Sequence, residues 1–188
     1  ALLDLAVAMK LVILDRDGVV NYDSDQFIKS PQEWKPIPGS LEAIARLNQA
    51  GYRVVLATNQ SGIERGLFDM AALNAINLKM FNWLAQHGGR IDAVFFCPHS
   101  ADTGCNCRKP KTGMFDEIAQ RFNISLSEVP SVGDSLRDVQ AAHAAGAQPI
   151  LVLTGKGEKT NAAGSLPPGT AVYANLADAV KTILRRAA

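Results

Sequence analysis

The sequence predicts an α/β protein in three layers, with a central parallel sheet covered by helices on both faces. Its strand-like segments are apolar throughout rather than at alternate positions, which is typical of strands buried on both faces. Segments with apolar residues at helical spacing separate these runs. The chain has 188 residues, which suits one domain with its own core.

Strand and helix segments alternate along the chain. The expected strands are 10–14, 53–58, 93–97, 129–133 and 149–153. The expected helices are 41–50, 69–87, 114–122, 135–145 and 177–185. Ser40 is a possible N-cap of the first helix, and Gly51 would end it. Residues 22–38 and 98–113 do not fit the alternation, and 155–169 read as a mobile surface loop.

Composition argues against several classes of protein. The net charge is +1 with scattered Lys and Arg, so the sequence does not predict a nucleic-acid partner. No apolar run approaches the roughly 18 residues that a membrane span needs. The beginning, "ALLDLAVAMK", lacks a basic leader, which favours a cytoplasmic protein. If Met9 is the natural start, residues 1–8 are an N-terminal extension and 9–188 a single domain, expected to be a monomer.

Two aspartates end the first predicted strand, in "LVILDRDGVVN". Asp15 and Asp17 are one residue apart and can project to the same side, and Gly18 lets the chain turn sharply behind them. Neighbouring carboxylates repel unless a cation lies between them or one stays protonated. Asp134 follows another predicted strand and would add a third oxygen ligand. Such an oxygen-rich site suits Mg²⁺.

Other polar groups follow the strands at the same predicted edge of the sheet. Thr58 and Asn59 offer hydrogen-bond donors, and Lys109 offers a fixed charge. With Mg²⁺ they form the set that phosphoryl transfer to a carboxylate nucleophile requires. Taken singly, the aspartates fit a turn, Thr58-Asn59 and Asp134 fit helix caps, and Lys109 fits a solvated charge. Their succession after several strands favours the functional interpretation.

Four motifs resemble those of the haloacid dehalogenase-like (HAD) phosphohydrolases: "LDRDGVVN", "TNQSG", "CRKP" and "VGDSLRD". The resemblance covers nearly the whole chain and implies a Rossmann-like HAD fold; we expect no large cap domain. It implies that Asp15 is the nucleophile and that Asp17 protonates the leaving alcohol and then activates water. Thr58 would bind the transferring phosphoryl group and Lys109 would neutralise it. Asp134 would join Asp15 and the Asp17 backbone carbonyl on Mg²⁺.

A narrower resemblance is to the heptose bisphosphate phosphatases, through "NQSGIERG", "CPH" and "CNCRKP". It implies removal of the 7-phosphate of a heptose 1,7-bisphosphate, a sugar phosphate on the route to the nucleotide-activated heptose of lipopolysaccharide. Histidinol-phosphate phosphatase is the alternative, although Ser61 and "GIERG" favour the heptose family. More distant alternatives are a phosphomutase and a zinc-stabilised binding module without catalysis.

The same resemblance implies contacts with the substrate. These fall on Asp23, Asn59, Gln60, Ser61 and Arg108. The planar guanidinium of Arg108 suits a second phosphate or sugar hydroxyls. Arg65 could also face the substrate, although a solvated charge near a helix start is the expected explanation. Two departures from the family are Val19, where many relatives have Thr, and Ser135, where some have Lys.

All three cysteines fall within residues 97–107. The spacing Cys97-x-His99-x₅-Cys105-x-Cys107 supplies three thiolates and one imidazole, a set typical of structural Zn²⁺. The alternative is a reduced cysteine loop in which His99 only caps. Four protein ligands leave no open position, so the zinc would hold the loop rather than react. Since Lys109 follows this loop directly, zinc would also fix its position.

Overall fold

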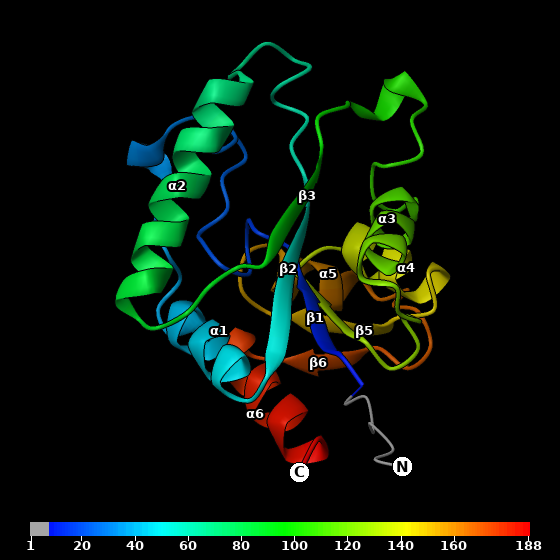
Figure 1. Cartoon of the computed structure of the whole chain (residues 1–188). Coiled ribbons are helices and arrows are strands. Elements are labelled where there is room, and N and C mark those ends of the chain that lie inside the picture. The colour runs from blue at the N-terminus through cyan, green and yellow to red at the C-terminus, as the bar shows by residue number, and fades with distance from the viewer. Residues whose placement is uncertain (1–7) are drawn as a thin grey trace.

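The computed structural model describes residues 8–188. Apart from Ala8, the expected N-terminal extension lies outside the described residues. Six strands form one parallel sheet in the order β3-β2-β1-β4-β5-β6 (Figure 1). The strands are β1 (Lys10–Leu14), β2 (Tyr52–Asn59), β3 (Ala93–Cys97), β4 (Pro130–Gly133), β5 (Gln148–Val152) and β6 (Ala171–Tyr173).

All five predicted strands are confirmed, with boundaries shifted by at most one residue. The sixth, β6, escaped prediction because it has three residues, none of them buried. The interpretation of 155–169 as a mobile loop was wrong for its first half, where helix α5 (Gly157–Ala163) forms. Its sequence, GEKTNAA, has no apolar stripe to reveal it, and the Thr160 hydroxyl ties it to the sheet by donating to the Asp134 carbonyl.

Helices cover both faces of the sheet, as predicted. One apolar core joins the sheet to α1 (Ser40–Gln49), α2 (Met70–Gln86) and α6 (Leu176–Arg186). The other core joins it to α3 (Gly113–Phe122) and α4 (Leu136–Ala144). Figure 1 shows α1, α2 and α6 on one side of the strands and α3 and α4 on the other. The molecule is therefore a three-layer α/β fold.

Side chains at the helix starts correct one sequence prediction. Asp69 caps α2 by accepting the Ala72 N–H, and Ser135 caps α4 in a capping box with Asp138. Ser40 is not a cap but the first residue of α1, following Gly39. Its buried hydroxyl donates to the Val19 carbonyl at 2.7 Å, which ties α1 to the turn after β1.

The irregular segment 22–38 packs against α2. Trp34 is fully buried and meets Trp83 of α2 edge-on, with ring centroids 6.4 Å apart. Lys79 of α2 donates to the carbonyls of Pro31 and Trp34. Pro31–Glu33 form a single 3-10 turn, η1. Over residues 8–188 no separate cap domain is inserted in the chain, and this segment borders one end of the sheet instead (Figure 1).

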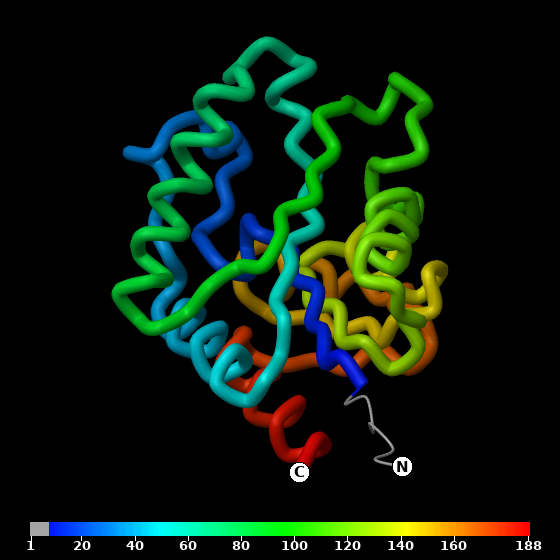
Figure 2. The backbone as a smooth tube through the Cα atoms, viewed as in Figure 1, coloured from blue at the N-terminus to red at the C-terminus, as the bar shows by residue number. Residues whose placement is uncertain are grey.

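The loops after β2 and β3 extend beyond the same end of the sheet (Figure 2). We call residues 98–112, between β3 and α3, the cysteine loop; it includes a 3-10 turn, η2 (Ala101–Thr103). The two loops are joined where the Glu64 N–H donates to the Pro98 carbonyl at 3.2 Å. No helix within residues 8–188 combines the length and apolarity that crossing a membrane requires.

Candidate active site

The strand order reverses between β1 and β4, which are neighbours at the centre of the sheet. In open parallel sheets, ligands bind beyond the carboxyl ends of the strands at such a switch point. Asp15 directly follows β1 and Asp134 directly follows β4. Carboxylate oxygens of Asp15, Asp134 and Asp138 lie within 4.8 Å of one another. The structure therefore brings together the two aspartates that the sequence predicted would share a cation.

The carboxylates of this cluster are held out of water. Burial, reinforced by the charge of Asp138, raises the pKa of Asp15 to about 7. Burial and the charges of Asp138 and Asp15 raise the pKa of Asp134 to about 9. Acids this close and this dry stay ionised only beside a cation. The donor set fits Mg²⁺, which prefers carboxylate and carbonyl oxygen and usually retains water or phosphate oxygen as further ligands.

Glycines allow Asp134 to approach the first strand closely. Gly18 has φ +85°, and a Cβ on it would lie 2.0 Å from Asp134 Oδ2. A Cβ on Gly155 would lie 2.2 Å from the same oxygen. The backbone N–H of Lys156 donates to that oxygen at 2.8 Å. Asp134 is thus enclosed by backbone on two sides, and its carboxylate has little freedom to move.

Asp17 is surrounded by four hydrogen-bond donors. Arg16 Nε reaches Oδ1 at 2.9 Å and Arg16 Nη2 reaches Oδ2 at 3.2 Å. Asn21 Nδ2 adds a bond of 2.9 Å to Oδ1, and Gln60 Nε2 adds one of 3.1 Å to Oδ2. Burial alone would raise the pKa of Asp17, but the Arg16 guanidinium and these hydrogen bonds lower it below its ordinary value. Asp17 is therefore held as a carboxylate.

Lys109 is buried, and its ammonium is fixed by three acceptors. Nζ lies 3.2 Å from Asp15 Oδ1, 2.7 Å from Asp138 Oδ1 and 2.6 Å from the Ala57 carbonyl. Burial alone would lower the pKa of Lys109, but the carboxylates of Asp138 and Asp15 raise it. The Asn59 side chain accepts the Lys109 N–H at 3.0 Å and donates to the Lys109 carbonyl at 3.2 Å. Lys109 is thus a charged group of fixed position beside Asp15.

Asp138 is a site residue that the sequence analysis missed. Its carboxylate pairs with Lys109 and accepts the backbone N–H groups of Asp134 and Ser135, at 3.1 and 3.0 Å. Its signal in the sequence is the spacing Ser135-x-x-Asp138, which predicts a capping box rather than a catalytic contact. The residue serves both purposes, since it caps α4 and positions Lys109.

A polar cavity of about 250 Å³ opens beside these groups. It is lined by Asp15, Asp17, Lys109 and Asp134, and also by all five predicted substrate contacts, namely Asp23, Asn59, Gln60, Ser61 and Arg108. Arg65, for which a contact with substrate was the alternative to a solvated charge, lines it too. Thr58 does not line the cavity: it is 1% exposed, and its hydroxyl accepts from Gln60 Nε2 at 2.8 Å. The role of Thr58 in binding the phosphoryl group stays a prediction.

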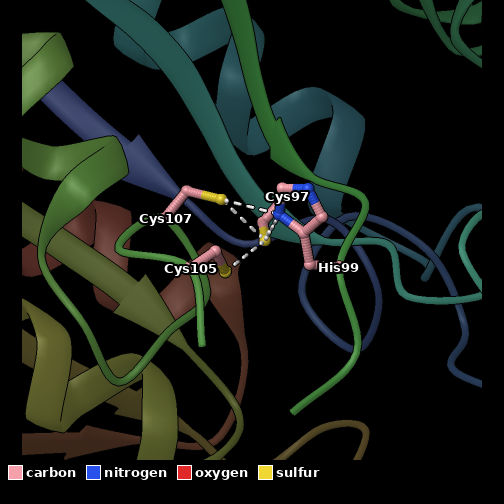
Figure 3. A group of neighbouring side chains, drawn as sticks. All are labelled: Cys97, His99, Cys105 and Cys107. Carbon is pink, nitrogen blue, oxygen red and sulfur yellow. Dashed lines mark hydrogen bonds between the residues drawn. The ribbon is translucent and has the colours of Figure 1, made fainter. Parts of the chain in front are cut away.

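The four predicted zinc ligands converge beside this site (Figure 3). Cys97 Sγ lies 3.7 Å from Cys105 Sγ and 3.6 Å from His99 Nδ1, and His99 Nδ1 lies 3.4 Å from Cys107 Sγ. Tetrahedral Zn²⁺ with bonds of about 2.0–2.3 Å would separate its ligands by roughly 3.4–3.8 Å. The Cys97–Cys107 sulfur distance of 2.9 Å is shorter than this range, so these two sulfurs would move apart to bind zinc, and it is too long for a disulfide of about 2.05 Å.

Without a cation these sulfurs would not ionise together. Burial, with the hydrogen bond from Cys107, raises the pKa of the Cys97 thiol to about 12. A thiolate at this position therefore needs a positive charge, which a metal ion would supply. The geometry and the donor chemistry are both compatible with a zinc site.

Family models and individual known proteins that match this chain point to the same class of enzyme. Residues 12–80 match the model of haloacid dehalogenase-like hydrolases and residues 106–179 that of HAD-hydrolase-like proteins. The D-glycero-beta-D-manno-heptose-1,7-bisphosphate 7-phosphatase of Bordetella bronchiseptica is 62% identical over 95% of this chain and 100% of that protein. The corresponding enzyme of Pseudomonas putida is 51% identical over 94% of this chain and 100% of its own length.

A solved crystal structure is also similar to this chain. The crystal structure of D,D-heptose 1,7-bisphosphate phosphatase from B. bronchiseptica, complexed with magnesium and phosphate, superposes with a TM-score of 0.94. The two chains are 61% identical, and the match covers 95% of this chain and 99% of that one.

A doubly wound parallel sheet with clustered carboxylates and a buried lysine at its switch point defines a phosphatase of the HAD class. The family models agree with this class over both halves of the chain. Within it, the chain belongs to the family of D-glycero-beta-D-manno-heptose-1,7-bisphosphate 7-phosphatases.

Proposed function

We propose that the protein hydrolyses the 7-phosphate of D-glycero-D-manno-heptose 1,7-bisphosphate and releases the heptose 1-phosphate. The observation that carries this proposal is the cluster of Asp15, Asp134 and Lys109 at the switch point of the sheet, within a chain so similar to named phosphatases of this substrate. The product would feed synthesis of the nucleotide-activated heptose of lipopolysaccharide. The matches do not favour histidinol phosphate as the substrate.

In the first step, a carboxylate oxygen of Asp15 forms a bond to phosphorus, and the bond from phosphorus to the O7 oxygen of the sugar breaks. Asp15 Oδ1 already accepts hydrogen bonds from the Arg16 N–H and from Lys109, which orients the carboxylate. Lys109 also offsets the negative charge that the phosphoryl oxygens carry in the transition state. The products of this step are the sugar alcohol and an aspartyl phosphate.

Asp17 is proposed to give a proton to the leaving O7 and then to remove one from the water that attacks phosphorus. In the second step, the new bond from water oxygen to phosphorus replaces the bond to Asp15, and inorganic phosphate leaves. Four donors hold Asp17 as a carboxylate, an arrangement suited to proton removal. To give a proton, Asp17 must first take one up from solvent, which requires its carboxyl group to turn away from Arg16 toward the cavity that it lines.

We propose that Asp15, Asp134 and the Asp17 backbone carbonyl hold Mg²⁺. When bound, the ion supplies charge neutralisation between the phosphate and the carboxylates. The Asp138 carboxylate lies in the same cluster, but its bonds to Lys109 and to two backbone N–H groups give it a positioning role.

Zinc is proposed to fill the site formed by Cys97, His99, Cys105 and Cys107. Four protein ligands would close the coordination shell, so this ion would be structural. Arg108 and Lys109 follow Cys107 directly, and Arg108 Nη1 donates to the His99 carbonyl at 3.2 Å. Zinc would thereby fix both cations. Thiols kept for a metal suit a reducing compartment such as the cytoplasm.

The test measures kcat/KM side by side for the heptose bisphosphate, as both anomers, and for histidinol phosphate. We expect the heptose bisphosphate to be preferred by more than tenfold. A smaller preference would contradict the substrate assignment. Asp15→Asn should abolish turnover while leaving the fold intact by circular dichroism. Equal activity of Asp15→Asn and wild type would show that the measured phosphatase is a contaminant.

A further inference from the structure

A hydrogen-bonded bridge joins the cysteine loop to the loop after β2, and Glu64 is at its centre. The Thr103 hydroxyl donates to the Glu64 carboxylate at 2.7 Å, and the backbone N–H of Ser100 donates to the same carboxylate. In the other direction, the Glu64 N–H donates to the Pro98 carbonyl at 3.2 Å. Across the described part of the chain, no cation lies within ion-pairing distance of this carboxylate, so a salt bridge does not compete with these contacts.

Both contacts of the carboxylate fall on the five residues between His99 and Cys105. Ser100 follows His99 directly, and Thr103 stands two positions before Cys105. The turn η2 between them buries no residue. Among the residues that the structure describes, Glu64 is the only one outside the cysteine loop that hydrogen-bonds to these five. Without Glu64, the span would be held only by the predicted metal ligands at its two ends.

The freedom of this span affects how tightly a metal binds. If the five residues move freely, closing the ligands on an ion also restricts the chain between them, which costs conformational entropy. A span that is already fixed does not incur that cost when the metal arrives. Partners outside the coordination shell typically change metal affinity by about 10- to 100-fold. Glu64 is placed to have this effect because its carboxylate holds both ends of η2.

The two bridged loops also carry groups of the active site. The cysteine loop carries Lys109, and the loop after β2 begins with Gln60. The Gln60 side chain donates to Asp17 at 3.1 Å, and its backbone N–H donates to the Cys97 carbonyl at 2.7 Å. A contact that fixes one loop against the other therefore bears on catalysis from outside the cavity.

We propose that Glu64 is a positioning residue, which clamps the span between His99 and Cys105 so that the cysteine loop holds zinc tightly. This inference rests on the part of the proposed function that assigns zinc to the three cysteines and the histidine. Glu64 is not one of these ligands and does not line the active-site cavity, so it acts through Ser100 and Thr103. When zinc is saturating, the ligands themselves hold the loop, and catalysis depends on Glu64 only when zinc is scarce.

The experiment measures the affinity of metal-free protein for zinc alone, by competition with a chromophoric chelator at fixed pH. Glu64→Ala should bind zinc about 10- to 100-fold more weakly than wild type. Glu64→Gln should have an intermediate affinity, since its amide oxygen still accepts a hydrogen bond. Glu117→Ala is the matched control and should bind zinc like wild type, because Glu117 is an exposed glutamate of α3 whose side chain has no hydrogen bond or ion pair within residues 8–188.

Thr103→Val tests the same contact from the cysteine loop. It should weaken zinc binding by less than Glu64→Ala does, because the Ser100 N–H still has its acceptor. Glu64→Ala/Thr103→Val should bind zinc no more weakly than Glu64→Ala, since the partner of Thr103 is already gone. The kcat of Glu64→Ala should fall at limiting zinc and return close to the wild-type value at saturating zinc.

The outcomes separate this inference from the proposed function. Unchanged zinc affinity in Glu64→Ala and Thr103→Val, or additive losses in the double variant, would overturn the inference alone. A wild type that takes up no zinc would overturn the assignment of the zinc site, and the inference with it. A wild type that binds zinc but does not hydrolyse the heptose bisphosphate would overturn the proposed activity, and the zinc affinities would still decide the role of Glu64. If circular dichroism shows that Glu64→Ala is unfolded, Thr103→Val decides.

Discussion

Replacing Gly18 by alanine should damage the magnesium site from a position that contributes no ligand side chain. At φ +85° an alanine pays a conformational penalty of about 1–2 kcal/mol. Its Cβ would also lie 2.0 Å from Asp134 Oδ2, where ordinary contact begins at 3.4 Å, so the carboxylate must retreat by about 1.4 Å. Mg²⁺ demands oxygen ligands at 2.0–2.1 Å in near-octahedral geometry, so a shift of this size removes Asp134 as a ligand.

Gly51→Ala is the matched control for this variant. Gly51 has almost the same φ, +87°, but its added Cβ would meet nothing within 4 Å. Both variants should be destabilised by the backbone penalty, which for a chain of this size lowers Tm by roughly 2–8 °C. Only Gly18→Ala should alter the metal site. The comparison therefore separates backbone strain from displacement of Asp134.

The assay titrates Mg²⁺ against phosphatase activity and follows Tm in parallel. Gly18→Ala should require at least tenfold more Mg²⁺ for half-maximal rate, since losing a metal contact typically costs at least that much affinity. Gly51→Ala should titrate like wild type. If both variants lose the same Tm and Gly18→Ala keeps a wild-type Mg²⁺ requirement, Asp134 is not a ligand of the ion.

Three further outcomes are expected. Asp138→Asn should lower the free energy of unfolding by about 3–5 kcal/mol in chemical denaturation and reduce kcat, because it leaves the buried Lys109 ammonium short of a counter-charge; an unchanged kcat would deny Asp138 its positioning role. Ser40→Ala should cost about 1–3 kcal/mol, since the buried Val19 carbonyl loses its donor, and should leave the kcat of the folded enzyme unaltered. Removing zinc with a chelator, or by Cys105→Ser, should lower kcat; full activity in protein shown by elemental analysis to be zinc-free would disprove the link between this ion and Lys109.

Much of the fold could be predicted because buried parallel strands leave a plain pattern. The run that ends at Asp15 is apolar at every position, and burial on both faces explains it. The short edge strand β6 has no such pattern because none of its residues is buried. Helix α5 was missed for a similar reason, since side-chain bonds such as the one from Thr160 to the Asp134 carbonyl anchor it, not an apolar stripe.

The site was predictable where a residue directly follows a strand, as Asp15 and Asp134 do. It was not predictable where one side chain has two functions. Asp138 has the spacing of a helix cap, and only the fold brings it to Lys109. Asn59 was expected to contact substrate and lines the cavity, and its amide is also bound to the backbone of Lys109, which the sequence did not predict. Neither partnership is local in sequence, so spacing along the chain could not reveal it.

The position of Lys109 immediately beyond the cysteine loop has a consequence for how the enzyme would respond to its surroundings. The sheet and its two cores hold the aspartates, but the key ammonium is delivered by a loop with little apolar material of its own. On this arrangement, protein deprived of zinc would keep its sheet and its aspartates in place but would hold Lys109 less firmly and work more slowly. Restoring the metal would restore the lost activity without new protein synthesis.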